Sequence, residues 1–267
     1  AIINLLPIET GEKVTAVIPC KEDSSGYIAM ATKNGLIKKT ALSEFDNIRK
    51  TGKIAISLVD TDELISVEYT DGNCEFILAS RKGKCIRFSE NDVRAMGRDT
   101  QGVKSMDIDS DDYIVNMEVV KDGYDIFTIS TNGYGKRSDI SDYRLQNRAG
   151  KGIKAGVFNA KTGDIACFKF VLPEDDILMI TDDGTIIRVQ ACEISKMGRD
   201  TQGVIIMRTD KGAVSTVAIT PHEEESEEDF DEETMADGEE NAEAAEGSAV
   251  SEESTASESA EEGETQE

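Results

Sequence analysis

The octapeptide MGRDTQGV occupies residues 96–103 and recurs, letter for letter, at residues 197–204. Two identical octapeptides are not expected by chance in a chain of 267 residues, so they indicate a repeated structural unit. Midway between the copies lies a related stretch, LQNRAGKGIKA (145–155), and another, NIRKTGKIAIS, occupies residues 47–57. The chain therefore carries four versions of one segment at a spacing of about 50 residues.

A second marker precedes each version of this segment. It reads ATKNGLIKKT (31–40), ASRKGKCIRF (79–88), STNGYGKRS (130–138) and TDDGTIIRV (181–189). Its turn glycines are Gly35, Gly83, Gly133 and Gly184, which lie 48, 50 and 51 residues apart. The later glycines follow them by 17, 19, 19 and 19 residues, at Gly52, Gly102, Gly152 and Gly203. Because two markers keep one period, the repeat is well defined.

Each repeat is predicted to hold four short strands. CEFILASRKGKCIRF (74–88) reads as a hairpin whose turn glycine has a positive φ, and GKIAISLV (52–59) and DELISVEYT (62–70) supply two more strands. Four strands in about 50 residues are typical of a propeller blade. The chain has no Trp, which excludes the WD class. Residues 1–19 align with 54–70 and are predicted to be the second half of a further blade, so we expect a fragment that begins inside the fold.

Charge divides the chain into two parts. Residues 1–220 hold 29 basic and 33 acidic side chains, whereas residues 221–267 hold 21 acidic and no basic ones. The second part is rich in Ser, Ala, Gly and Glu and cannot bury enough apolar surface to offset its ordering entropy. We therefore predict an all-β domain over residues 1–220 and a disordered acidic tail over 221–267, which would include the single histidine, His222.

Charge also follows the repeat. The net charge is +4 over residues 33–53, 81–104 and 133–154, and −6 over residues 54–80 and 105–132. The last repeat is weaker, with −1 over residues 182–204. Equivalent positions of successive blades lie on one rim. Lys and Arg can serve there to protect edge strands, but the same excess in three successive repeats favours a band that binds phosphates.

Other chemistry has less support in the sequence. Asp107, Asp109, Asp111, Tyr113, Ile114 and Glu118 fall at positions 1, 3, 5, 7, 8 and 12 of a calcium-binding loop, but Asp112 stands where the sharp turn requires Gly. The five cysteines are far apart and form no CxxC pair, which fits a reducing cytoplasm rather than disulfides or zinc. No apolar run approaches the ~18 residues of a membrane span.

The stretches NGLIKKT, RKGKCIRF, NGYGKR, VRAMGRDTQGV and EISKMGRDTQGV resemble the C-terminal domain of the bacterial DNA gyrase A protein, over residues 1–220. The resemblance implies a β-pinwheel, a propeller-like ring of four-stranded blades that exchange strands with their neighbours. In that family a basic rim wraps duplex DNA, so that the enzyme introduces negative supercoils. The family's box Gln-Arg-Arg-Gly-Gly-Lys-Gly is missing, and QNRAGKG (146–152) is its nearest match.

The resemblance also implies partners. The chain would be non-catalytic by itself and part of an ATP-hydrolysing type II topoisomerase, with the rest of the gyrase A protein and with the gyrase B protein in a complex of two copies of each. ATP and Mg²⁺ would belong to the whole enzyme, with no cofactor in this fragment. A bacterial cytoplasmic location, no membrane contact and a monomeric isolated domain are expected.

The predicted DNA contacts are basic residues of the hairpins and of the segments that follow them. They are Lys38, Lys39, Arg49, Lys50, Lys84, Arg87, Arg94, Arg98, Lys104, Lys136, Arg137, Arg148, Lys151, Lys154, Arg188 and Arg199. Removing eight of them in pairs is expected to weaken DNA binding in proportion to the charge lost, without unfolding the domain; these are Lys38, Lys39, Arg87, Arg98, Lys136, Arg137, Arg148 and Lys151. Two other interpretations remain: the equivalent domain of topoisomerase IV, whose blades are usually fewer and more degenerate, and a propeller that binds protein.

The acidic tail gives a prediction of its own. A segment of charge −21 tethered to a basic rim is expected to compete with DNA, and salt should screen this competition. A chain ending at Thr220 should then bind DNA more tightly than the full chain at low salt, and the difference should close as salt rises. Equal affinities across the salt range would leave the tail as a solubilising segment.

Overall fold

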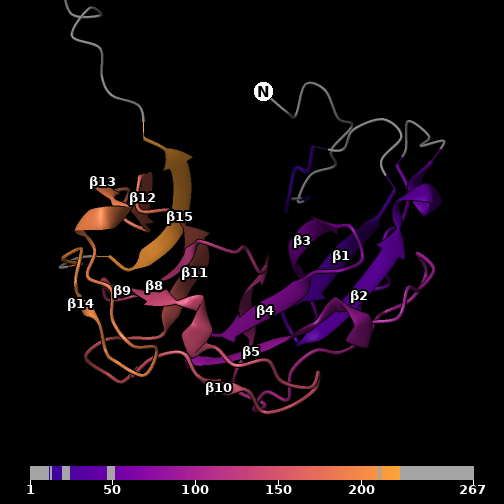
Figure 1. The fold of residues 1–267 in the computed structure, drawn as a ribbon, viewed down its shortest axis with the longest axis horizontal. Helices are drawn as coiled ribbons and strands as arrows, with labels where there is room; N and C mark the ends of the chain where they lie inside the picture. The colour runs from indigo at the N-terminus through magenta and orange to yellow at the C-terminus, as the bar shows by residue number, and fades with distance from the viewer. Residues whose placement is uncertain (1–11, 13, 20–24, 47–51, 210–211, 223–267) are drawn as a thin grey trace, which may run out of the picture. The chain divides into compact units, whose positions relative to one another are not determined.

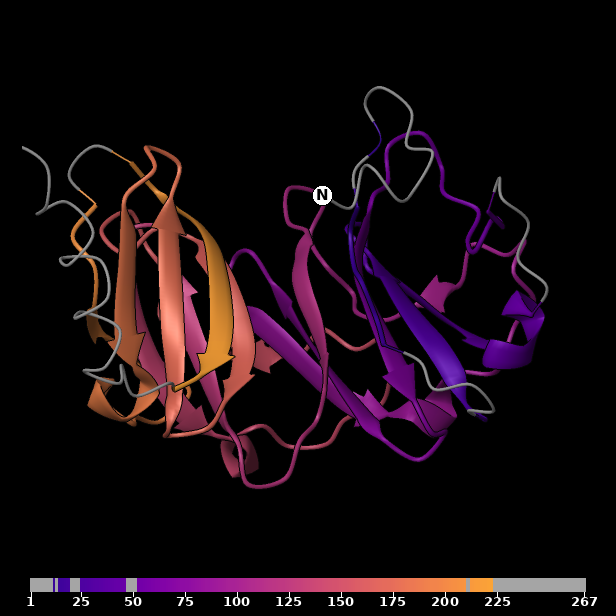
Figure 2. The same cartoon turned by 90° about the horizontal axis from the view of Figure 1, so that it is seen from above.

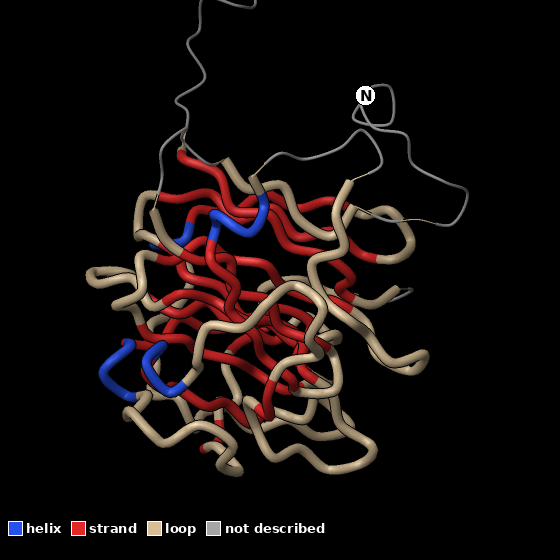
Figure 3. Tube along the Cα trace, turned by 90° about the vertical axis from the view of Figure 1, so that its right-hand side faces the viewer, coloured by secondary structure: helices blue, strands red, loops and turns tan. Residues whose placement is uncertain are grey.

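Short antiparallel strands joined by turns make up nearly all the regular structure of the computed structural model (Figure 3). The structure describes residues 12, 14–19, 25–46, 52–209 and 212–222. The chain divides into a unit Ala1–Glu223 and a second unit Glu224–Glu267. The second unit lies outside the described residues, so the predicted disorder of the tail stays a prediction.

Four antiparallel sheets follow one another along the chain (Figures 1 and 2). The first contains, in spatial order, β3 (Leu64–Thr70), β1 (Tyr27–Thr32), β2 (Leu36–Ala41) and β6 (Val103–Lys104). The second contains β7 (Ile114–Val119), β4 (Glu75–Ser80), β5 (Lys84–Ser89) and β10 (Ile153–Lys154). The third contains β11 (Ile165–Val171), β8 (Asp125–Ser130), β9 (Tyr134–Asp139) and β14 (Val204–Ile205). The fourth contains β15 (Val214–Pro221), β12 (Asp175–Thr181) and β13 (Ile186–Gln190).

Each repeat begins with the predicted hairpin, and its turn glycine has a positive φ, as at Gly83 (φ +90°). A 3-10 turn follows the hairpin in every repeat: η2 (Leu42–Phe45), η3 (Glu90–Asp92), η4 (Ile140–Asp142) and η5 (Ala191–Glu193). These turns are the helical segments of the described residues, and none is long and apolar enough to cross a membrane. The all-β prediction is therefore confirmed.

Neighbouring sheets exchange strands. The two-residue strands β6, β10 and β14 come from the repeat that follows, yet each pairs with the hairpin of the preceding repeat: β6 with β2, β10 with β5, and β14 with β9. The octapeptide is therefore the link from one blade back to the sheet before it. This is the exchange that the resemblance implied.

Two expectations about strands were wrong in detail. Residues 52–59 form no strand, and in later repeats the equivalent strand has only two residues. Its partner is the hairpin of the preceding repeat, and the described residues before β1 contain no such hairpin. For the same reason the fourth sheet has three strands, since no later repeat in the described chain adds one. The half-blade predicted for residues 1–19 lies mostly outside the described residues, and 14–19 contain no strand.

The exchange gives every blade two different edges. Strands β3, β7, β11 and β15 stand at one edge of their sheets and each contacts the next, so they form the inner edges. The exchanged strands β6, β10 and β14 lie at the opposite, outer edges. The segments around the exchanged strands therefore lie at equivalent outer positions in successive blades.

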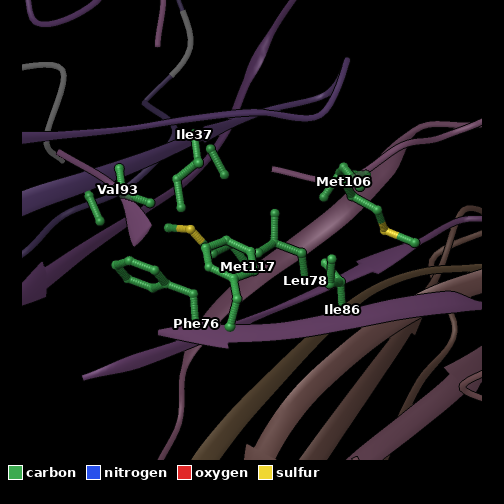
Figure 4. Close-up of a cluster of buried hydrophobic side chains, with 11 residues drawn as sticks. Ile37, Phe76, Leu78, Ile86, Val93, Met106 and Met117 are labelled. Atoms are coloured by element: carbon green, nitrogen blue, oxygen red, sulfur yellow. The ribbon is translucent and has the colours of Figure 1, made fainter. Parts of the chain in front are cut away.

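The core lies between sheets rather than within one. In β4, Phe76 and Leu78 pack toward the first blade, whereas Ile77 and Ala79 pack toward the third, as the two-residue period of a strand requires. Figure 4 shows the first cluster, where Ile37 meets side chains from the second repeat. A fully buried Phe or Leu contributes about 1.5–3 kcal/mol. Because both faces of β4 are buried, its four central residues, 76–79, are all apolar.

Glu68, on the inner strand β3, gives a pH prediction. Burial, together with the nearby charge of Glu118, raises the pKa of Glu68 to about 7. The carboxylate is then charged above pH 7 in the folded state at a cost in stability, and this cost vanishes below the unfolded pKa of about 4.5. Glu68→Gln should stabilise the domain at pH 8 by about 1 kcal/mol, allowing for partial solvent screening.

Urea unfolding at pH 8 and at pH 4.5 checks this prediction. The gain in unfolding free energy from Glu68→Gln should be present at pH 8 and absent at pH 4.5. The control Glu174→Gln, at an exposed position, should show no such difference between the two pH values. A gain from Glu68→Gln that is equal at the two pH values would show that the carboxylate does not titrate as described.

Candidate nucleic-acid interface

The basic side chains of the repeats fall into two groups, which the sequence did not separate. The cations of the hairpins are largely buried: Lys38 is 0% exposed, Lys136 2%, Lys39 6% and Arg137 9%. The cations of the segments after the hairpins are half-exposed or exposed. The exposed hairpin cations are Lys82, in a turn, and Arg188, in the last hairpin, so most of the cations open to a phosphate backbone belong to the second group.

In each of the first three hairpins, one cation donates hydrogen bonds to the 3-10 turn of the next repeat. Lys39 Nζ lies 3.3 Å from both the main-chain oxygen and the carboxylate of Glu90. Arg87 Nη1 donates to the carbonyls of Ile140 and Tyr143, each at 3.2 Å. Because these positions are equivalent, the cation is a recurring link between blades.

The third repeat repeats this arrangement with more contacts. Arg137 donates through Nε to Ile194 O (2.9 Å) and through Nη2 to Cys192 O (3.3 Å), and its Nη1 pairs with Asp125 at 2.9 Å. In the last repeat Arg188 pairs with Asp176 at 2.5–2.8 Å, and the described residues contain no later turn for it to hold.

His222 is a correction to the expected boundary. It was assigned to the acidic tail, but β15 runs to Pro221 and His222 Nδ1 lies 2.9 Å from Asp176 Oδ2. The blade therefore includes residues 221 and 222. Asp176 is 1% exposed, so it holds the end of the last strand from inside the sheet.

The second hairpin cation lies beneath the octapeptide. Lys38 Nζ donates to the carbonyls of Ala55 (2.7 Å), Thr100 (3.2 Å) and Arg98. Lys136 Nζ donates to the carbonyls of Gly198 (3.1 Å), Thr201 (3.0 Å) and Arg199. Burial lowers the pKa of Lys136 to about 8, against the opposing charge of Asp200, and burial also lowers the pKa of Lys38.

The octapeptide arginines link one connection to the previous one. Arg98 Nη1 donates to Ile54 O at 2.9 Å, and Arg199 Nη1 donates to Lys154 O at 2.6 Å. Arg148 makes the equivalent contact to Lys104 O. All three side chains are half-exposed. Each arginine thus has a structural partner, and its predicted phosphate contact stays a prediction.

Among the predicted contacts that the structure describes, the exposed side chains lie on and around the exchanged strands, apart from Arg188 in β13. Arg94, Lys104, Lys151 and Lys154 are exposed, with Lys104 in β6 and Lys154 in β10. Arg144 is also exposed, and sequence reasoning did not single it out although it follows Arg94 by one repeat. Lys84 is half-buried and pairs with Asp109 at 3.1 Å. Arg49 and Lys50 lie outside the described residues.

The acidic stretch 107–118 has other roles in the structure. Asp107 pairs with Lys104 at 2.5 Å, and Asp111 pairs with Lys82. Asp112 is buried and accepts the backbone N–H of Lys82 at 3.0 Å. Among the described residues no group of three or more His, Cys, Asp or Glu is arranged to hold a metal ion. The carboxylates order the turns instead.

Comparison with known proteins agrees with this geometry. The family model described as "DNA gyrase C-terminal domain, beta-propeller" matches residues 26–71, 75–121, 124–165 and 175–222. These are the four repeats that the sheets define, and together they cover more than half of the chain. The fold is thus a propeller-type domain with exchanged strands. The chain belongs to the DNA gyrase C-terminal domain family.

Curated relatives are similar over most of this chain. The DNA gyrase A protein of Escherichia coli is 41% identical over 242 residues, which are 90% of this chain and 28% of the relative. The DNA gyrase A protein of Staphylococcus epidermidis is 39% identical over 230 residues, 84% of this chain and 26% of the relative. The chain thus spans about a quarter of the length of these relatives.

Two solved structures share the fold. One is the C-terminal domain of DNA topoisomerase IV, with a TM-score of 0.78 and 26% identity over 82% of this chain and 70% of that one. The other is a DNA gyrase A C-terminal domain, with a TM-score of 0.73 and 27% identity over 82% of this chain and 74% of that one. The fold alone therefore does not separate the two kinds of enzyme.

Proposed function

We propose that this domain binds duplex DNA along the outer edges of its blades, through the exposed cations of the connections. The observation that carries the proposal is the recurrence of exposed cations one repeat apart: Lys104 and Lys154 on the exchanged strands β6 and β10, and Arg94 and Arg144 just after the 3-10 turns. Cations at one repeating position suit the regularly spaced phosphates of a duplex.

The contacts are to phosphates rather than bases. The exchanged strands have two residues each and the connections are short, so no long helix or ribbon of the described chain is available to enter a groove. Backbone contacts fix the path of DNA without reading its sequence. Affinity is then expected to be largely independent of sequence and to fall steeply with salt.

Sequence similarity favours gyrase over topoisomerase IV, since the relatives that match at about 40% identity are gyrase A proteins. We infer that the domain bends or wraps DNA for a type II topoisomerase built from two gyrase A and two gyrase B proteins in the bacterial cytoplasm, and so promotes negative supercoiling. ATP and Mg²⁺ would act elsewhere in that enzyme. A supercoiling assay with the complete enzyme separates gyrase from topoisomerase IV.

Removing exposed connection cations tests the proposal. The double variant Lys104→Met, Lys154→Met should weaken DNA binding and reduce the log–log salt slope by about 1.8, since each phosphate contact contributes about 0.9. Fluorescence anisotropy with duplexes of unrelated sequence, from low to moderate salt, measures both quantities.

The control removes one charge away from the connections. Lys121 is an exposed lysine just after the inner strand β7, and Lys121→Met should leave the salt slope unchanged, whereas Lys104→Met alone should reduce it by about 0.9. Equal losses in these two single variants would mean that net charge, rather than the outer edges, governs binding. Strong preference for one duplex sequence would contradict phosphate contacts, as would a flat salt response, which would favour a protein partner.

A further inference from the structure

The residue beneath each connection changes together with the connection itself. Three hairpin positions are equivalent by the repeat: Lys38, Ile86 and Lys136. The connections that cross them are MGRDTQGV, QNRAGKGI and MGRDTQGV, in that order. Lysine thus stands under both copies of the octapeptide, and isoleucine under the divergent version.

The two lysines make the same contacts. Each ammonium group donates to the carbonyls of the third and fifth octapeptide residues, which are Arg98 and Thr100 in the first copy. The second copy presents Arg199 and Thr201 in the same way. Each group also has a further carbonyl partner, so three N–H donors meet at least three acceptors. Carbonyls that converge on a buried point need a donor, because burying them unpaired is costly.

The divergent connection differs in its backbone path rather than in this backbone bond. Ser57 N–H donates to Thr100 O at 3.2 Å and Val157 N–H to Thr201 O at 3.3 Å, and Asp107 N–H donates in the same way to Gly150 O at 2.9 Å, so the lysine is an additional donor under the octapeptides. The preceding Ala149 has φ +66°, the one positive φ of a non-glycine residue among those that the structure describes. A Cβ on Gly150 would lie 3.7 Å from Ile86 Cδ1, so an apolar side chain fits beneath this backbone. The different backbone path therefore suits the different residue below it.

We propose that Lys38 and Lys136 are positioning residues, each of which sets the conformation of the octapeptide above it, and that the octapeptide and the lysine form one exchangeable pair. In the full chain this pair fixes where Arg98 and Arg199 leave the backbone. The importance of these arginine positions rests on the proposed DNA binding, whereas the pairing of lysine with octapeptide does not depend on it. Neither lysine contacts DNA.

A double-mutant cycle on the last connection tests the pairing. The first variant is Lys136→Ile. The second converts the first five residues of the connection to the divergent QNRAG with Met197→Gln, Gly198→Asn, Asp200→Ala and Thr201→Gly. The third combines the two and has the net charge of the wild type. The exposed Lys151→Ile is the control for loss of one charge.

Two readouts not involving DNA are the melting temperature and amide hydrogen exchange over residues 197–204. Lys136→Ile should lower the melting temperature by about 5–10 °C and speed exchange in this segment about tenfold or more. The combined variant should recover most of both losses, and Lys151→Ile should show neither. Additive losses in the combined variant would overturn the proposal, as would wild-type behaviour of Lys136→Ile.

Should Lys136→Ile fail to fold, the reciprocal change gives the same information. Ile86→Lys should destabilise the second blade, and rebuilding residues 146–150 as MGRDT should relieve the loss. No relief would overturn the pairing. DNA affinity is measured separately. If the combined variant recovers its stability but the chain binds no DNA, the pairing is supported and the proposed function is refuted.

Discussion

Gly102→Ala is expected to destabilise the domain by about 2–5 kcal/mol, combining left-handed backbone strain with overpacking. Gly102 has φ +104°, and a Cβ there would lie 2.6 Å from Ile37 O in the hairpin beneath. Ile37 O belongs to the strand β2, and Gly102 directly precedes the exchanged strand β6, so the sheet pairing on both sides limits how far the backbone can move apart. Exchange of β6 into the first sheet should therefore fail, and urea unfolding measures the loss.

Gly97 provides a matched control in the same octapeptide. A Cβ at Gly97 would meet no atom within 4 Å, and its φ is not in the left-handed region. Gly97→Ala should change the unfolding free energy by less than about 1 kcal/mol. Similar losses for the two variants would mean that Gly102 is not required by its contact with the hairpin.

Arg137→Met is expected to cost about 3 kcal/mol, the scale of a buried ion pair broken from one side. The change leaves the carbonyls of Ile194 and Cys192 without their donor and removes one partner of Asp125, which is 7% exposed. Lys196, at 2.7 Å from Asp125, remains and limits the loss. The fourth blade should be the part that loosens.

Arg144→Met is the control, since it removes the same charge from an exposed side chain. Arg144→Met should change the unfolding free energy by no more than about 0.5 kcal/mol. It should weaken DNA binding more than Arg137→Met does. A stability loss as large as that of Arg137→Met would show that the two groups of cations are not distinct.

The repeat was predictable because its markers depend on local physics. A hairpin turn that needs a positive φ selects glycine, so Gly35, Gly83, Gly133 and Gly184 recur at one period. The exchanged strands were not predictable from pattern, because two residues such as Val103 and Lys104 carry no period. The exchange entered through the family resemblance. The expected strand at 52–59 was wrong because pairing depends on a neighbouring repeat.

The site was predictable as a charge period but not as individual side chains. Lys38 and Lys104 look alike in the sequence, yet one is fully buried and the other exposed. What separates them is the connection that crosses the first sheet: it covers Lys38, whose ammonium group donates to the carbonyls of Arg98 and Thr100. Composition alone counts both lysines as surface charge.

The exchanged strands also impose an order on synthesis. The first sheet lacks its outer strand until residues 103 and 104 have been made, by which time the hairpin of the second repeat is already complete. The second and third sheets wait in the same way for the repeat that follows. On the ribosome, completion of blades would thus run one repeat behind the growing chain, with one outer hairpin edge always open near the exit tunnel. A nascent chain of this kind is most exposed to wrong pairing at its newest hairpin.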